Sequence, residues 1–353
     1  MAGAGLYEVG SGKPYSTISA ALAQLWIDQS SAAFAATQEI RVYEGTYNEY
    51  VNPNPGLAPT ATYRLLLQAA PGTLPVVDEQ LSISSNAIEL GQYPVRGPHF
   101  TTIRGFKVTN CLYNGIAIDA DDLLIYDNIA SDCNHGIMLD VGNRVKVYSN
   151  YCFDCTSQGW QGGDDFETAG IFIRGTDSTV YDNLTRACEC GLDLENCSKA
   201  RIYNNTSYLD ASNGIRIYTA NNTCKNNVVW SNVGTCLRVE TAGQTGFTSD
   251  YNDLYPTGTA NVGYWTSARA TLGDWTTASG QDTHSISSDP KFNYAGGVND
   301  YDYKIQSNSP CLKVGLNLSS EFLLDYWGVT RDSSAPWDMG FYEFVGSGFF
   351  SFF

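Results

Sequence analysis

Apolar and polar residues alternate in short segments that recur between residues 101 and 240. Each segment begins with glycine, places apolar side chains at its second and fourth positions, and ends on a polar or charged residue. Five copies have this form, at residues 115–119, 136–140, 170–174, 191–195 and 214–218, and a looser sixth copy occupies 236–240. Alternation with a period of two predicts strands that bury one face.

A second motif, tyrosine-any residue-asparagine, keeps the same period between these segments. It occurs at Tyr126/Asn128, Tyr148/Asn150, Tyr181/Asn183 and Tyr203/Asn205, and Asn227 follows at the same interval. Both motifs lengthen their step at the same place, before residue 170. Self-similarity at a period of about 22 residues is typical of a solenoid. Helical periodicity and leucine-rich spacing are missing, so the pattern predicts a right-handed parallel β-helix whose coils stack at roughly 4.8 Å.

The chain is expected to form a single domain, because a solenoid carries one continuous core. Within residues 1–353 we expect an N-terminal cap at 1–35, coils at 36–256, and C-terminal coils with an irregular cap at 257–353. A short amphipathic helix near 19–28 should cover the N-terminal end, with Leu22, Leu25 and Trp26 on its apolar face. Residues 257–288 are expected to form a loop with a short helix near 268–275, and residues 289–343 are expected to close the C-terminal end.

The asparagines of the second motif should stack at a corner, bond to one another along the axis and tolerate left-handed backbone. Cys133, Cys155 and Cys188 each follow such an asparagine by five residues, and Cys111 fits the preceding coil. We expect an inward ladder of free thiols that behave as small apolar residues. A disulfide between adjacent coils remains an alternative, because their Cα atoms would lie near bonding distance.

The two ends of the chain resemble a known family. The segments GSGKPYSTISAAL and IRVYEGTYNEYV near the start, with DYDYKIQSNSPCLKVG and DYWGVTRDSSAPWDMGFYEF near the end, are similar to right-handed β-helix repeat proteins of the pectin-lyase-like superfamily. The resemblance implies the fold. It does not imply one activity, because the family includes lyases, hydrolases, epimerases, phage tailspikes and adhesins.

Charge and hydropathy narrow the classes of partner. The 37 acidic residues outnumber the 20 basic ones, which gives a formal charge of −17. Nucleic acid and anionic membrane surfaces are therefore not expected partners, and no stretch is long and apolar enough to cross a bilayer. Residues 1–5 lack the features of a signal peptide. The expected location is extracellular or virion-associated.

Successive strand residues face opposite sides, so the repeats also predict two outward columns. The first contains Ala117, Met138, Phe172, Asp193, Arg216 and Arg238; the second contains Asp119, Asp140, Arg174, Glu195, Tyr218 and Glu240. Neighbouring coils would place side chains ~5 Å apart and alternate coils ~10 Å apart. These are the separations of retaining and inverting carboxylate pairs.

The coil before strand 170–174 is longer than the others by about a dozen residues, at 156–168. Insertions on one face of a solenoid often mark its binding face. This loop carries Trp160, Asp164, Asp165 and Glu167. His135 is expected on the adjacent rim. The predicted substrate-binding residues are Trp160, Tyr218, His135, Arg238 and Phe172.

Two chemistries fit these residues. In β-elimination, Asp140, Asp164 and Asp165, with Glu167 nearby, would hold Ca²⁺ through oxygen, and Arg216 or Arg174 would be base or carboxylate clamp. In hydrolysis, Asp193 would work with Asp140 or Glu195.

The expected function is therefore that of a polysaccharide lyase or glycoside hydrolase acting on an extracellular polysaccharide. The alternative is a non-catalytic structural or glycan-binding protein, such as a phage tailspike, virion decoration or adhesin, whose sheet charges form ordinary cross-strand pairs. The Phe-rich tail at 344–353 either packs under the C-terminal coils or docks to a second subunit or larger assembly.

Overall fold

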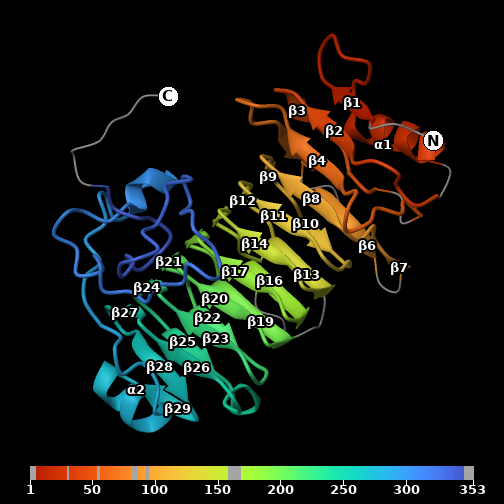
Figure 1. Cartoon of the computed structure of the whole chain (residues 1–353). Coiled ribbons are helices and arrows are strands. Elements are labelled where there is room, and N and C mark those ends of the chain that lie inside the picture. Colours follow the sequence, from red (N-terminus) through yellow and green to blue (C-terminus); the bar gives the residue numbers. More distant parts are fainter. Residues whose placement is uncertain are drawn as a thin grey trace.

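The computed structural model describes residues 5–29, 32–53, 56–80, 86–92, 95–157 and 168–345. They form a parallel β-solenoid in which each coil contributes to three long sheets (Figure 1). Among these residues the two α-helices are α1 (Ile18–Gln29) and α2 (Leu272–Ser279), with 3₁₀ turns at η1 (Thr241–Gly243) and η2 (Asp300–Tyr303). No helix in this part of the chain has the length and hydropathy needed to cross a membrane.

The three sheets are named in the order in which a coil visits them. The first sheet contains β1 (Leu6–Val9), β2 (Gln38–Val42), β4 (Leu65–Ala69), β8 (Thr101–Arg104), β11 (Leu124–Tyr126), β14 (Lys146–Tyr148), β17 (Thr179–Tyr181), β20 (Arg201–Tyr203), β23 (Thr223–Lys225) and β26 (Thr248–Asp250). The second contains β3 (Thr46–Tyr47), β5 (Val76–Asp78), β9 (Lys107–Thr109), β12 (Ile129–Ser131), β15 (Tyr151–Phe153), β18 (Leu184–Arg186), β21 (Thr206–Tyr208), β24 (Val228–Ser231) and β27 (Asp253–Pro256). The third contains β7 (Val95–Arg96), β6 (Ile88–Gln92), β10 (Asn114–Ile118), β13 (His135–Asn143), β16 (Ala169–Thr176), β19 (Cys190–Ser198), β22 (Asn213–Ile217), β25 (Thr235–Val239), β28 (Asn261–Trp265) and β29 (Ser267–Arg269).

The alternating segments form the third sheet, as the pattern predicts. Their second positions pair in one row along the axis and are almost fully buried: Ile116, Ile137, Ile171, Leu192, Ile215 and Leu237. Each segment begins with glycine because the backbone of the next coil and a core side chain lie too close for a Cβ atom. A Cβ on Gly136 would lie 2.7 Å from the Gly170 carbonyl oxygen and 2.9 Å from the Cys152 sulfur, so a larger residue would push adjacent coils apart.

The predicted asparagine ladder is present at the corner between the first and second sheets. The side-chain Nδ2 of Asn128 donates to Asn150 Oδ1 at 3.1 Å, and Nδ2 of Asn150 donates to Asn183 Oδ1 at 2.9 Å. The ladder continues through Asn205, Asn227 and Asn252. The expectation about backbone was wrong by one position, because the left-handed φ belongs to the residue before each ladder asparagine, such as Asp127 at 56°. The outward turn residue takes the unusual backbone, and the asparagine points inward to satisfy buried peptide groups.

The cysteines are free thiols buried in the interior, as expected. Cys111, Cys133, Cys155 and Cys188 have no exposed surface. Burial raises the pKa of the Cys133 and Cys188 thiols, which keeps them protonated. They fill the core as small apolar side chains.

Helix α1 packs on β1 and β2 and buries Ile18, Ala21, Leu22 and Leu25. It lies at the N-terminal end of the solenoid, where the amphipathic pattern placed it (Figure 1). The first strand, β1, already lies within the segment expected to be only a cap, and it pairs with β2 in parallel.

The C-terminal part differs from the expectation in two respects. The segment expected to be a loop contains β28, which extends the third sheet, and α2 closes that end by placing the buried Trp275 ring against Gly263. Residues 289–345 do not cover the end. They form a flank that packs along the side of the solenoid against the second sheet, including Tyr151 and Leu184 (Figure 1). Phe344 is half-buried in this flank, and the remaining phenylalanines of the tail lie outside the described residues.

Candidate functional site

The first predicted column lies in register on the outer face of the third sheet, and the second column follows directly after the paired residues. Strand pairing aligns Ala117, Met138, Phe172, Asp193, Arg216 and Arg238, and Tyr264 of β28 extends the row. The second column follows the paired residues Ile118, Leu139, Ile173, Leu194, Ile217 and Val239. The repeat therefore fixes the order in which charged and aromatic groups meet along the axis.

Arg174 lies at the centre of the second column, between two carboxylates. Its Nη1 lies 2.6 Å from Asp140 Oδ1, and its Nη2 lies 3.3 Å from Glu195 Oε2. The three side chains are between 17% and 30% exposed. Because the groups are reachable by solvent, a ligand carboxylate can compete for the guanidinium without entering the core.

The first column is more buried than its outward position predicts. Phe172, Asp193 and Arg216 are almost completely inaccessible, and Phe172 packs with Ala169 and Cys190. Alternation identifies the side of the sheet, and it carries no information on what packs against that side. The expectation that these three residues line an open surface was therefore wrong.

Asp193 and Arg216 form a bidentate ion pair. Arg216 Nη2 donates to Asp193 Oδ2 at 2.6 Å, and its Nε donates to Oδ1 at 3.2 Å. Both carboxylate oxygens are engaged, so proton transfer from Asp193 would require breaking a buried pair. The Arg216 guanidinium also lies over the Tyr218 ring, 4.7 Å from its centroid. This geometry suits a rigid support more than a general acid.

The C-terminal end of the site repeats the combination of arginine, carboxylate and aromatic ring. Arg238 Nε lies 2.5 Å from Glu240 Oε1, and the guanidinium is 4.3 Å from the Tyr264 ring centroid. Arg238 is one-third exposed. Two arginines of the face, Arg174 and Arg238, are thus partly open and held by neighbouring groups.

His135 does not lie on a rim. It is buried, its Nδ1 accepts a hydrogen bond from the Ala169 N–H at 3.0 Å, and its ring contacts Phe172. Burial, with a smaller effect of Arg174, lowers the pKa of His135 to about 3. The imidazole is neutral at ordinary pH and positions the start of β16 beside β13.

The predicted loop residues Trp160, Asp164, Asp165 and Glu167 lie outside the described residues. In the part of the chain that is described, no cluster of three or more His, Cys, Asp or Glu side chains is arranged to hold a metal ion. Asp140 is paired with Arg174. The described residues therefore do not make a calcium site by themselves.

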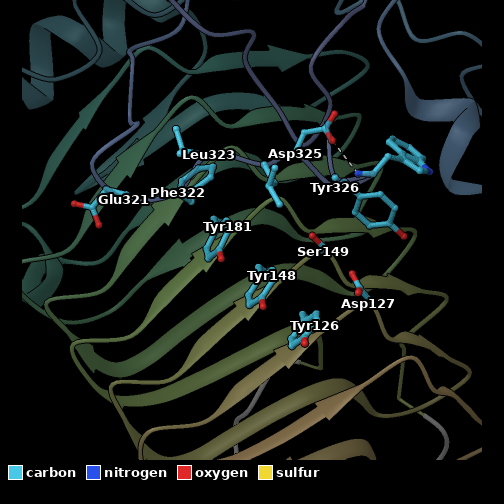
Figure 2. Close-up of a pocket in the computed structure, with 13 residues that line it drawn as sticks. Tyr126, Asp127, Tyr148, Ser149, Tyr181, Glu321, Phe322, Leu323, Asp325 and Tyr326 are labelled. Carbon is cyan, nitrogen blue, oxygen red and sulfur yellow. Dashed lines mark hydrogen bonds between the residues drawn. The ribbon is translucent and has the colours of Figure 1, made fainter. Parts of the chain in front are cut away.

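A hollow that the sequence did not predict lies where the flank meets the first sheet (Figure 2). Tyr126, Tyr148 and Tyr181 form one side and residues 321–328 form the other, enclosing a volume of ≈ 590 Å³. We call it the tyrosine groove. The repeated tyrosines were visible in the sequence, but the position of the flank, which makes the hollow, was not.

Comparison with known proteins agrees with the architecture. A family model described as a right handed beta helix region matches residues 94–254. Among solved structures, the chain is similar to pectate lyase Pel9A, with a TM-score of 0.54 and 14% identity over 97% of each chain. It is also similar to an alginate lyase from Paenibacillus sp. str. FPU-7 (TM-score 0.50, 12% identity, 80% of this chain and 99% of that chain). A rhamnogalacturonan lyase is similar too (TM-score 0.53, 13% identity, 72% and 74%). Comparison with curated proteins gives no significant match, and identities this low show the fold alone.

Proposed function

The chain is a right-handed parallel β-helix protein with the pectate-lyase-like fold, and we propose that it binds an extracellular polysaccharide along the outer face of its third sheet. The observation that carries the proposal is the partly exposed row Asp140–Arg174–Glu195, continued by Tyr218, which directly follows the next strand, β22. Strand spacing repeats these groups every ~5 Å along the axis. An extended ligand lying along that axis would meet them one after another. The similar solved structures are named as polysaccharide lyases, which supports a glycan as the ligand.

Within this proposal, the ligand is an acidic polysaccharide and the reaction is β-elimination. Guanidinium groups bind carboxylates in a planar, two-point geometry, and Arg174 and Arg238 are the partly open arginines of the face. Arg174 would exchange Asp140 or Glu195 for a sugar carboxylate, and the carboxylate released by that exchange would accept the α-proton. Arg174 would stabilise the charge that develops as the glycosidic C–O bond breaks and a C=C bond forms, and the leaving sugar oxygen would take up a proton from water. Hydrolysis is less well supported, because Asp193 is held by Arg216.

A non-catalytic glycan-binding role is the second candidate, and one observation favours it. Asp140, Glu195 and Glu240 each pair with an arginine of the same face. A general base or acid must exchange protons with the substrate, and paired carboxylates are poor at doing so. Such a surface would bind a chain without cleaving it, as in an adhesin or a virion protein.

The test uses wild-type protein with a panel of acidic and neutral polysaccharides. Elimination creates unsaturated uronates that absorb in the ultraviolet, hydrolysis creates reducing ends without that absorbance, and binding alone is measured by affinity electrophoresis. Arg174→Gln should weaken acidic-polysaccharide binding by about tenfold or more, because a hydrogen bond between charged groups contributes roughly 1.5–3 kcal/mol. Arg41→Gln is the matched control, since Arg41 is one-third exposed and pairs with Glu39 on the first sheet.

The results separate the candidates. Ultraviolet-absorbing products that disappear in Arg174→Gln support a lyase. Binding without products, lost in the same variant, supports the glycan-binding role. Equal binding by Arg174→Gln, Arg41→Gln and wild type would remove the third-sheet face as the site.

A further inference from the structure

We propose that the tyrosine groove is a second binding site, separate from the third sheet, and that it takes an uncharged oligosaccharide. It lies on the first sheet, where β11, β14 and β17 run under the segment that carries Phe322 to Tyr326 (Figure 2). Its volume of ≈ 590 Å³ falls within the range of small-molecule sites. The inference does not depend on the function proposed above.

One wall is a stack of aromatic rings. The centroids of Tyr126 and Tyr148 are 4.6 Å apart, those of Tyr148 and Tyr181 are 4.8 Å apart, and Phe322 of the flank closes the stack at 4.3 Å from Tyr181. Because ring faces cover one another, the groove receives ring edges and hydroxyl groups. Burial raises the pKa of Tyr148 and Tyr181, so both hydroxyls keep their protons and can donate. Among the described residues, the Tyr181 hydroxyl makes no hydrogen bond.

The opposite wall is held in place by a buried carboxylate. Asp325 Oδ1 accepts from the N–H groups of Trp327 at 2.9 Å and Val329 at 2.8 Å, and Oδ2 accepts from Glu343 N–H at 2.9 Å. Leu323 and Leu324 on this wall are 45% and 52% exposed. A loop fixed by three hydrogen bonds, with apolar side chains left uncovered, is a preorganised wall.

The groove marks the point at which the flank stops covering the corner of the solenoid. In the later coils the outward turn residues are bonded to the flank: Asp182 to Arg331, Asn204 to the Asp338 carbonyl, and Asn226 to Leu316. The corresponding residues of the two preceding coils, Asp127 and Ser149, line the groove instead. The polar side chains of Asp127 and Ser149 therefore face the groove, whereas those of the later coils are hydrogen-bonded to the flank.

Charge decides the class of ligand. The carboxylates open to the groove are Asp127 and Glu321, since Asp325 is bonded to its own loop, and among the residues that the structure describes no Lys, Arg or His lines the groove. The Arg104 guanidinium nearby donates to Gln68 and to the Tyr126 hydroxyl. Carboxylates accept hydrogen bonds from hydroxyl groups and repel anions. With phenol hydroxyls and apolar surface beside them, they suit a hydroxyl-rich, uncharged sugar chain and disfavour the acidic chain proposed for the third sheet.

The test is calorimetric titration of the full protein with neutral hexasaccharides of glucose, xylose, mannose and galactose, beside hexagalacturonate and pentalysine. At least one neutral sugar should bind. Tyr148→Phe, which keeps the ring stack, should weaken it by about threefold to tenfold, as expected for one neutral hydrogen bond. Asp127→Asn should weaken it by about tenfold or more, because charged acceptors contribute more.

Tyr203→Phe is the matched control, because Tyr203 occupies the same column of the first sheet but is buried against Leu318 and Trp337. It should bind neutral sugar as the wild type does, and so should Arg174→Gln, which separates this site from the third sheet. The proposal is overturned if no neutral hexasaccharide binds, if Tyr148→Phe and Asp127→Asn weaken the binding of hexagalacturonate or pentalysine more than that of the neutral sugar, or if both variants, shown to be folded by their thermal unfolding, bind the neutral sugar as tightly as Tyr203→Phe.

Discussion

Replacing Arg331 with methionine tests how the flank is attached to the solenoid. The Arg331 side chain is fully buried, and its guanidinium contacts Asp182 Oδ1 at 2.7 Å and Glu343 Oε2 at 2.9 Å. Asp182 belongs to the corner after β17, 149 residues earlier in the chain. Arg331 therefore joins the flank to the coils through a buried network that also contains the Gly340 carbonyl oxygen.

The expected cost of Arg331→Met is roughly 3–5 kcal/mol, because removing one partner leaves buried carboxylates without their counter-charge. Arg144→Met is the control. Arg144 makes an equally short contact with Asp122, at 2.7 Å, but it is 54% exposed, and exposed pairs contribute only about 0–1 kcal/mol. Burial, and not the ion-pair distance, should therefore decide the difference between the two variants.

Urea unfolding followed by circular dichroism measures both costs, and hydrogen exchange locates them. Exchange should accelerate in peptides from 311–345 in Arg331→Met and stay slow in the asparagine ladder. The deficit should also shrink as the pH falls from 8 to 5. Burial already raises the pKa of Asp182, and Arg331 opposes the rise. Without the arginine, the buried carboxyls of the folded protein should take up protons at a higher pH. The loss of stability is complete only while these carboxyls are ionised, so it should become smaller as the pH falls. A loss below about 1 kcal/mol, equal to that of Arg144→Met and without faster exchange, would refute the reasoning.

Three further outcomes are expected. Burial raises the pKa of folded Asp210 to about 7. The stability that the protonated carboxyl contributes is therefore fully present below its pKa in the unfolded chain, and up to about 4 kcal/mol of it should be lost as the pH rises through 7. Asp210→Asn should reduce the difference in the free energy of unfolding between pH 5 and pH 8, measured in urea, and an unchanged difference would contradict the prediction. Asp193→Asn removes the carboxylate that pairs with buried Arg216 and should cost roughly 3–5 kcal/mol, whereas a thermal midpoint equal to that of wild type would show that the pair is dispensable. The ten buried cysteines should resist a thiol reagent in the native protein and all react in denaturant, and rapid labelling without denaturant would argue against the packed ladder.

The fold and the strand register could be predicted from the sequence because the same short segment repeats. A glycine followed by alternating apolar residues specifies which side chains point inward, and the regular step specifies which ones meet on the next coil. The contact of Arg174 with Asp140 and Glu195 follows from these two facts alone. The asparagine ladder follows in the same way.

What the sequence could not provide depends on single contacts between distant segments. Residues 289–345 have no periodicity, so nothing in them indicated that Arg331 reaches Asp182 or that Phe322 reaches Tyr181. The burial of Asp193 was missed for a related reason, since the repeat specifies the face of a strand and not the cover over it. The tyrosine groove forms where the repeated tyrosines of the first sheet meet the non-repeating segment 321–328. The sequence pattern predicted only the repeated part.

The short antiparallel strand β29 has a consequence for how copies of the chain meet. It pairs with β28 and consists of Ser267, Ala268 and Arg269. The C-terminal edge of the third sheet is therefore a short antiparallel strand that carries a charged side chain. A flat edge of parallel strands offers free peptide groups to any other chain, and short charged edges are the usual defence against such joining. Deleting residues 261–279 would leave β25 as that edge. Because the opposite end keeps α1 and the antiparallel strand β7, molecules so trimmed should join through their C-terminal edges into dimers.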